Sequence, residues 1–228
     1  MIGIIGAMDI EVEKLKTLML GAREENICGV SFVSGTLWGR ETVVAVSGVG
    51  KVNAAACTQA MIIRYSPDFI INSGVAGCLA PDLDVLDMVI ASGVVQHDMD
   101  TSPLGDPIGF ISGINKIVIP CSSLICEKLL SAASESGVKC RSGIIASGDR
   151  FVASKEEKNR IVSQFDAVSC EMEGGAIGHV CYKCGVEFAV IRSMSDKADG
   201  EASVSYNDLK QIASDNLVKV LKNFYNTL

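Results

Sequence analysis

Acidic side chains stand just after several apolar, strand-like runs of this sequence, and carboxyl groups in such places can donate or accept protons. The acids are Glu11 after residues 2–8, Asp149 after 143–147, Glu171 and Glu173 after 167–170, and Asp196 after 187–192. In an open α/β sheet, ligands bind at the carboxyl ends of the strands. We therefore expect these acids to face a common crevice.

Acids after strands can also be helix caps, because they accept hydrogen bonds from free backbone N–H groups and favour the positive end of the helix dipole. Here Glu171 and Glu173 flank a single Met, and Arg192 lies four residues before Asp196. Capping alone does not require so many charges close together. The pattern therefore favours a site.

Length and composition indicate one α/β domain spanning residues 1–228. The chain is 48% apolar, and its 22 Gly and five Pro are scattered without forming a linker. The net charge is −7 and no stretch gathers Lys and Arg with aromatics, so nucleic acid is not an expected partner. Asp9, Glu11 and Glu13 interrupt the N-terminal apolar run, and no run is long enough to span a bilayer. We expect a cytoplasmic protein that does not bind a membrane.

The nine cysteines lie mostly inside apolar segments, which is typical of reduced, buried thiols. One spacing, His179-x-Cys181-x-x-Cys184, could contribute to a zinc site if a second ligand pair existed. The other cysteines are dispersed and the only other histidine is His97. We therefore expect neither a metal nor a cofactor.

Apolar runs and amphipathic stretches alternate along the chain, as in a sheet covered on both faces. Strands are expected at 2–7, 31–35, 41–46, 69–72, 88–95, 116–119, 143–147, 167–170 and 187–192, and helices at 11–19, 50–64, 122–136, 154–164 and about 207–225. Strands 31–35 and 41–46 read as a hairpin that turns at Trp38-Gly39.

Two glycine-rich turns follow strands, at residues 47–51 and 73–77. Neither is a phosphate-binding loop: Ala45 stands where the first glycine of a P-loop belongs, and Val52 stands where Ser or Thr would hold magnesium. Neither matches the dinucleotide pattern. Glycines here would let the backbone approach a flat base or sugar, although a simple tight turn explains the first loop equally well.

Five motifs in order give the chain an end-to-end resemblance to the 5'-methylthioadenosine/S-adenosylhomocysteine nucleosidases. They are Gly3-Ile-Ile-Gly-Ala-Met-Asp-Ile-Glu11, Asn72-Ser-Gly-Val-Ala-Gly77, Ser147-Gly-Asp-Arg-Phe151, Glu171-Met-Glu173 and Arg192-Ser-Met-Ser-Asp196. The resemblance implies the nucleoside phosphorylase/hydrolase fold, a three-layer sandwich whose central mixed, mostly parallel twisted sheet is flanked by helices. It also implies a homodimer in which each subunit borders its partner's pocket.

The same resemblance implies a reaction, hydrolysis of the N-glycosidic bond of an adenine nucleoside to adenine and a 5-thioribose, which serves methionine salvage and removes a by-product of methylation. By carry-over, Glu11 activates water, Asp196 protonates adenine N7, and Arg192 lies near Glu173 and the water. Residues implied to bind substrate are Met8, Gly77, Phe151, Val152, Met172, Glu173 and Ser195; Met172 and Glu173 would hold the ribose hydroxyls and Phe151 would stack on adenine.

The chemistry of the bond supports two acids with different protonation. Loss of adenine leaves positive charge on the ribose, so the leaving base must be protonated on one side while a water is deprotonated on the other. Asp196 must then keep its proton near neutral pH, whereas Glu11 must be ionised. How water activation divides between Glu11 and Glu173 stays open.

Some residues are candidates for binding the 5' tail of the substrate, and others differ from the pattern of the family. Met8, Val49, Phe151 and Met172 are candidates for an apolar slot around a 5'-alkylthio group, although any one Met is more often plain core. Cys78 stands where many relatives have Gly, and the pair Gly174-Gly175 replaces bulkier residues, which is expected to loosen the start of a helix. The segment 97–113 would govern tail specificity if it lines the partner's pocket.

Two rival functions remain. A phosphorylase would use phosphate in place of water, but Asp9 and Glu11 would repel a dianion. A nucleoside-binding protein without activity would not need both a proton donor and a proton acceptor. The residues fit methylthioadenosine, adenosylhomocysteine, deoxyadenosine and futalosine-type nucleosides alike.

Overall fold

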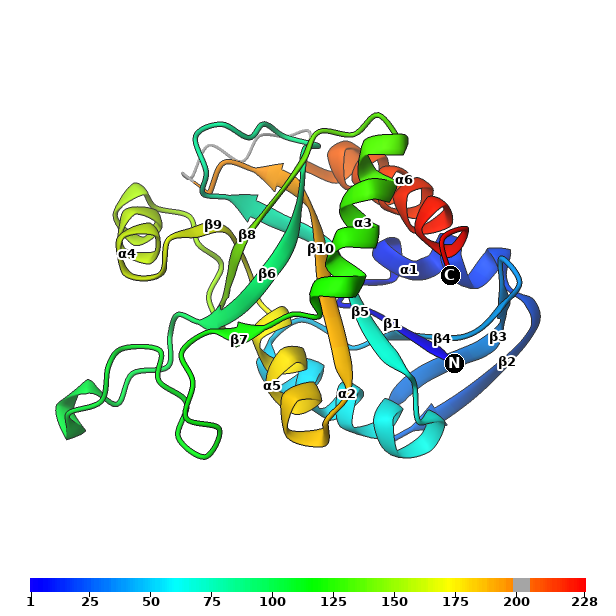
Figure 1. Cartoon of the computed structure of the whole chain (residues 1–228), viewed down its shortest axis with the longest axis horizontal. Helices are drawn as coiled ribbons and strands as arrows, with labels where there is room; N and C mark the ends of the chain where they lie inside the picture. The colour runs from blue at the N-terminus through cyan, green and yellow to red at the C-terminus, as the bar shows by residue number, and fades with distance from the viewer. Residues whose placement is uncertain (199–205) are drawn as a thin grey trace.

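The computed structural model describes residues 1–198 and 206–228, and a ten-stranded mixed sheet forms its centre (Figure 1). The strands are β1 Ile2–Gly6, β2 Leu20–Ile27, β3 Val30–Leu37, β4 Arg40–Val46, β5 Phe69–Cys78, β6 Met88–Gln96, β7 Ile119–Pro120, β8 Cys140–Ser147, β9 Ala167–Glu171 and β10 Glu187–Asp196. The helices are α1 Asp9–Leu18, α2 Lys51–Tyr65, the short 3-10 helix η1 Ser102–Leu104, α3 Ser123–Glu135, α4 Lys155–Phe165, α5 Gly174–Cys184 and α6 Tyr206–Tyr225.

Parallel pairing in the middle of the sheet brings several strand ends together. Strand β1 lies between β4 and β5, and β5 also pairs with β10; all three pairings are parallel. Strands β6, β8 and β9 form a second parallel series. Antiparallel pairings of β10 with β6 and of β5 with β9 join the two series into a closed ring. The carboxyl ends of β1, β5 and β10 therefore lie at the same edge of the sheet.

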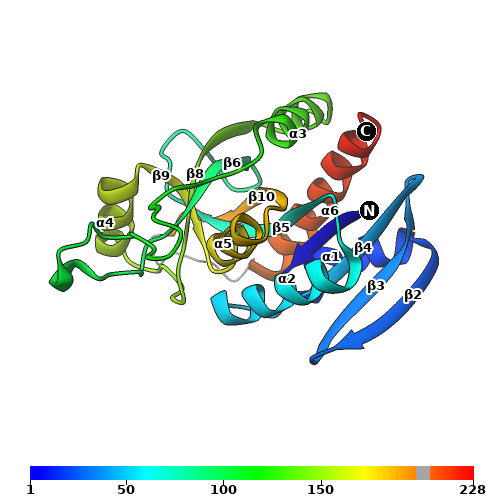
Figure 2. The same cartoon turned by 60° about the horizontal axis from the view of Figure 1, so that its bottom comes forward.

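Helices cover both faces of this sheet, which confirms the expected sandwich. Helices α2 and α5 pack together on one face, while α1, α3 and α6 pack together on the other (Figures 1 and 2). The strands between them are almost wholly apolar; for example, all five residues of β1 are buried. A sheet buried on both faces requires this composition, because neither face meets water.

The edge strand β2 differs from the central strands and has no counterpart in the expected elements. Seven of its eight residues are exposed, and it carries Arg23, Glu24 and Glu25 on an open edge. Charges on an edge strand discourage pairing with another chain, but they also hide the apolar alternation by which strands are recognised. The strand expected at 116–119 is also wrong in extent, since β7 comprises only Ile119 and Pro120, and proline lacks the N–H that a longer ladder needs.

Gly174 and Gly175 do not loosen helix α5 as the sequence suggested; they allow its start to pack closely. A Cβ added to Gly175 would lie 2.9 Å from Ser147 Oγ, and one added to Gly174 would lie 3.3 Å from Glu171 Oε1. Their N–H groups donate to these same side chains. Side-chain acceptors thus stabilise the helix start and offset the low helix propensity of glycine.

All nine cysteines are free thiols, and six of them are buried. On α5, Cys181 is buried, whereas Cys184 is exposed and its Sγ lies 3.8 Å from Gln59 Oε1. Within residues 1–198 and 206–228, no group of three or more His, Cys, Asp or Glu could hold a metal ion. No helix in these ranges is long and apolar enough to cross a membrane.

Candidate active site

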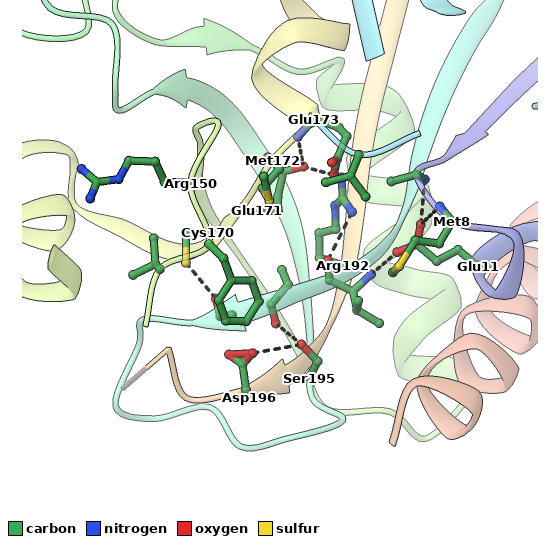
Figure 3. Close-up of a pocket in the computed structure, with 17 residues that line it drawn as sticks. Met8, Glu11, Arg150, Cys170, Glu171, Met172, Glu173, Arg192, Ser195 and Asp196 are labelled. Atoms are coloured by element: carbon green, nitrogen blue, oxygen red, sulfur yellow. Dashed lines mark hydrogen bonds and ion pairs between the residues drawn. The ribbon is translucent and has the colours of Figure 1, made fainter. Parts of the chain in front are cut away.

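One cavity opens at the edge where the carboxyl ends of β1, β5, β9 and β10 meet (Figure 3). All ten residues that the sequence proposed for catalysis or substrate binding line it. These are Met8, Glu11, Gly77, Phe151, Val152, Met172, Glu173, Arg192, Ser195 and Asp196. Five segments far apart in the sequence thus meet at a single site.

Glu11 is held by backbone donors from two elements. Its Oε2 accepts from the N–H groups of Ala7, at 2.7 Å, and Met8, at 3.0 Å, at the start of α1, and its Oε1 accepts from Val75 on β5 at 2.9 Å. Glu11 is only 3% exposed. It therefore caps its own helix and faces the cavity at once, so both interpretations of this acid hold. The ionised form suits this role, because a carboxylate only accepts hydrogen bonds.

Gly74 on β5 is the residue that makes room for this arrangement. A Cβ at this position would lie 2.3 Å from Glu11 Oε1 and 2.5 Å from Arg192 Nη1. Only glycine lets the acid and the guanidinium approach the strand so closely.

Arg192 lies at the bottom of the cavity and is 1% exposed. Its Nη2 donates to Glu171, to Asn72 Oδ1 and, at 3.4 Å, to Glu173 Oε2, while its Nη1 donates to the Val75 carbonyl at 3.2 Å. Burial alone would lower the pKa of this guanidinium, but Glu171 and the neighbouring acids raise it above its ordinary value. The guanidinium stays charged and offsets part of the negative charge around it.

Glu171 is the main partner of Arg192, although the sequence assigned it no role beyond facing the crevice. Its Oε2 also accepts from the N–H groups of Glu173, at 3.0 Å, and Gly174, at 2.7 Å, and its Oε1 accepts from the Ser147 hydroxyl. The expected position of Arg192 beside Glu173 is therefore incomplete. The signal available in the sequence was the spacing of Glu171 and Glu173, which places both acids at one helix start.

Glu173 lies in an environment that opposes its ionisation. Burial and then the charge of Glu171 raise its pKa to about 7, against the lowering effects of Arg192 and of the Gly50 N–H, which donates to its Oε1 at 2.9 Å. Near neutral pH this group can therefore exist in either form.

Asp196 and Ser195 lie on a different side of the cavity from Glu11, as Figure 3 shows. Asp196 Oδ1 accepts from the Ala198 N–H at 3.0 Å, and Ser195 Oγ lies 3.4 Å from Asp196 Oδ2. Phe151, which also lines the cavity, is 57% exposed. The two acids proposed for proton transfer thus share one cavity and have different surroundings.

Asp149 does not face the common crevice, contrary to expectation. It is exposed and absent from the cavity lining, and its Oδ1 accepts from the Lys51 N–H at 2.7 Å at the start of α2. Asp149 therefore caps a helix, but this helix is α2, which is distant in the sequence, whereas α4, the helix after Asp149, is capped by Ser154.

Several lining residues carried no role in the sequence interpretation: Ala7, Val75, Ala76, Arg150 and Cys170. Four of the five are small or apolar, and their side chains resemble ordinary core residues. Only their positions beside the recognised motifs could have indicated them. Val49 lines the cavity as expected for the apolar slot.

Comparisons with known proteins agree with this geometry. The family model of the phosphorylase superfamily matches residues 1–226. The 5'-methylthioadenosine/S-adenosylhomocysteine nucleosidase of Shewanella halifaxensis is 39% identical over 208 residues, which cover 91% of this chain and 90% of that protein. This chain belongs to the phosphorylase superfamily, among these nucleosidases.

Solved structures of the family have the same fold. A mutant of the Helicobacter pylori nucleosidase with 5'-methylthioadenosine in its active site has a TM-score of 0.94 at 37% identity, covering 100% of this chain and 98% of that one. The Neisseria meningitidis nucleosidase in complex with methylthio-immucillin-A has a TM-score of 0.95 at 33% identity, covering 100% and 99%. A futalosine hydrolase of Helicobacter pylori has a TM-score of 0.94 at 37% identity, covering 100% and 97%.

Proposed function

We propose that this nucleosidase family member hydrolyses the N-glycosidic bond of 5'-methylthioadenosine and S-adenosylhomocysteine, releasing adenine and the 5-thioribose. One observation carries the proposal: a single cavity holds Glu11 and Asp196 on different sides, with a charged arginine between acids at its base. The relative from Shewanella halifaxensis, nine-tenths of which is covered by the match, is named for this activity.

Glu11 is the base that activates water. A carboxylate has about four acceptor positions, and three backbone N–H groups fill three of them here. The remaining position is available to a water in the cavity. Because the three donors belong to the backbone, the carboxylate keeps its place while the proton moves.

Asp196 is the acid that protonates the purine at N7. Phe151 would stack on the adenine, while Gly77 and the backbone of Val152 would border it. A Cβ on Gly77 would lie 3.1 Å from Asp196 Oδ1, so glycine at this position keeps the space beside the acid open. General acid and general base assistance each contribute about 10²- to 10⁴-fold to a rate.

The sugar lies between these ends, with Met172 and Glu173 at its hydroxyls. Positive charge that develops on the ribose is stabilised by the acids Glu11, Glu171 and Glu173 around it. Arg192 prevents these acids from repelling one another, because its guanidinium reaches both Glu171 and Glu173.

The cavity suits water better than phosphate as the acceptor of the ribosyl group. Of the two arginines that line the cavity, Arg192 is occupied by acids, and Arg150 lies at the rim near Glu157, 3.8 Å away. Neither of these two lining arginines is placed to hold a dianion beside Glu11. The test is adenine release from 5'-methylthioadenosine by the purified protein, with and without phosphate. Equal rates are expected, and release that strictly requires phosphate would identify a phosphorylase.

The protein functions as a homodimer in this proposal. Residues 97–113 do not line the cavity of their own chain, and they extend away from the body of the molecule beside α4 (Figure 1). Large apolar side chains are exposed on this segment and on α2: Leu104 is 85% exposed, Val52 79% and Ile63 74%. A second copy would cover them and complete the 5' pocket. Light scattering should give twice the mass of the chain, and activity that stays constant in a fully monomeric preparation would contradict the proposal.

The 5' substituent is the part of the substrate that remains to be ranked. Met8, Val49 and Met172 line the cavity and can adapt to tails of different size. Comparing kcat/KM for methylthioadenosine, adenosylhomocysteine, deoxyadenosine and a futalosine-type nucleoside would give the order directly.

A further inference from the structure

Two loops border the cavity from outside the sheet. The first loop comprises residues 47–51 and contributes Val49 to the lining; the second comprises residues 147–152 and contributes Arg150, Phe151 and Val152. They are about a hundred residues apart in the sequence, so neighbouring positions along the chain do not hold them together.

Three charged residues that do not line the cavity join these loops. Lys51 Nζ donates to Asp98 Oδ1 at 2.7 Å, Asp98 Oδ2 accepts from the Asp149 N–H at 2.9 Å, and Asp149 Oδ1 accepts from the Lys51 N–H at 2.7 Å. The contacts form a closed circuit through both loops and the segment after β6. The side chains of Lys51 and Asp98 are 18% and 22% exposed, so water screens their ion pair only in part.

The second loop also lies directly on a buried histidine. His97 is 1% exposed, and its backbone N–H donates to the Ser147 carbonyl at 2.9 Å. A Cβ on Gly148 would lie 2.4 Å from the ring Nε2 of His97. The backbone at Gly148 therefore has no room to move toward β6. Asp98 holds the same loop by accepting from the Asp149 N–H, one residue after Gly148.

The first loop carries a donor that the site uses. The Gly50 N–H donates to Glu173 Oε1 at 2.9 Å, and Gly50 adopts φ +98°, a conformation that favours glycine. A Cβ at Gly50 would lie 3.1 Å from Asp149 Oδ1, so the second loop touches the first at this residue. Lys51, the next residue, is the one that the circuit holds.

We propose that Lys51, Asp98 and Asp149 are positioning residues: they fix the loops 47–51 and 147–152 relative to each other and so hold the Gly50 N–H against Glu173. This inference rests on the proposed function for its kinetic readout. Charge-assisted hydrogen bonds suit the task, because they are shorter and more directional than neutral ones.

Loss of the circuit has a specific electrostatic consequence. Glu173 faces Glu171 from β9, Glu11 from α1, Arg192 from β10 and the Gly50 N–H from the first loop. Of these, the N–H is the only group that the circuit positions. When it moves away, the ionised form of Glu173 loses a donor, and its pKa rises further.

The experiment compares Asp98→Asn and Lys51→Met with the matched control Asp215→Asn. Asp215 pairs with Lys14 at 2.8 Å on the exposed surface and takes no part in the site. For each variant, kcat and KM for 5'-methylthioadenosine are measured between pH 5 and pH 9. We expect KM to rise about tenfold and the acidic limb of kcat/KM to move about one pH unit upward in the two test variants, with no change in the control.

Substitutions of Asp149 give a second pair of variants. Because this residue is exposed, we expect both variants to fold. Asp149→Ala removes the acceptor for the Lys51 N–H and should reproduce the shift, whereas Asp149→Asn keeps a side-chain oxygen and should restore much of the wild-type profile. An unchanged acidic limb in Asp98→Asn and Asp149→Ala, with a lower melting temperature alone, would overturn the positioning role. Wild-type protein that releases no adenine would instead contradict the proposed function.

Discussion

The two ends of the cavity are built differently. At the closed end, Glu11, Glu171, Glu173 and Arg192 are between 1% and 8% exposed, and fixed donors hold each acid. At the open end, Asp196 is 9% exposed and accepts from the Ala198 N–H, but Phe151, which also lines the cavity, is 57% exposed. The closed end is complete before a ligand arrives, whereas the open end still has apolar surface to bury. We infer that charge stabilisation is preorganised at the closed end and that the purine supplies much of the packing at the open end.

The largest expected effect is the loss of activity when either proton-transfer acid is replaced. The stability of the two variants should then distinguish the two acids. Both Glu11→Gln and Asp196→Asn should lower kcat by about 10²- to 10⁴-fold, because each removes one proton transfer. Only Glu11→Gln should also destabilise the fold, because its amide group cannot accept from all three backbone N–H groups, and each buried unpaired donor costs about 1–3 kcal/mol. Steady-state kinetics and urea unfolding give the two quantities.

Calorimetry with a non-hydrolysable adenosine analogue provides the control for this pair. Asp196→Asn should still bind the analogue, since asparagine keeps an oxygen for the Ala198 N–H. Equal destabilisation by both substitutions would show that the two ends do not differ in their preorganisation.

A smaller effect should follow from one methyl group at each end. In Gly74→Ala the new Cβ would lie 2.3 Å from Glu11 Oε1, whereas in Gly77→Ala its nearest contacts are 3.1 Å away. We expect kcat/KM to fall about 100-fold for Gly74→Ala and about tenfold for Gly77→Ala, because overpacking a rigid site costs about 1–3 kcal/mol. The ratio of kcat/KM between the two variants is the measurement, and a larger loss in Gly77→Ala would reverse the comparison.

The last effect concerns stability and not activity: it is the pH dependence of unfolding at the closed end. Burial and Glu171 raise the pKa of Glu173 from 4.5 to about 7, so between these values the folded state binds more protons than the unfolded state. The free energy of unfolding should therefore fall as pH rises from 4.5 to 7, by at most about 3 kcal/mol. Urea unfolding at half-unit intervals of pH measures the slope.

Glu173→Gln removes the contribution of Glu173 to this slope of unfolding free energy against pH, because glutamine does not titrate. The slope should flatten in that variant and remain in Glu135→Gln, which changes an exposed glutamate on α3. A slope that is identical in wild type and Glu173→Gln would show that Glu173 titrates normally in the folded protein.

Local patterns in the sequence predicted much of what the structure contains. Apolar runs gave most strands, and the helix expected at 154–164 is α4, which Ser154 caps by accepting from the Glu157 N–H. The five motifs contain nine of the ten expected lining residues, and the tenth, Val152, directly follows the third motif. Motifs succeeded because each lies at a strand end, and strand ends of one sheet meet. The exposed strand β2 was missed because its side chains do not alternate in polarity.

Which side chains pair with one another, in contrast, was decided by the tertiary structure. Arg192 lies opposite Gly74 and Ser147 opposite Glu171 in the sheet register, which brings Arg192 to Glu171 and gives that acid a hydroxyl donor. Asp149 turned toward Lys51 and away from the cavity. No spacing along the chain encodes such pairings.

The sequence by itself determined which acids this protein carries, in what order, and that they follow buried strands. Only the tertiary structure decided which acid meets the guanidinium, which caps a helix, and which joins two loops. The physical reason is the range of the interactions: apolar periodicity and capping act within a few residues, whereas ion pairs in a buried site depend on the register of strands that are distant in the chain.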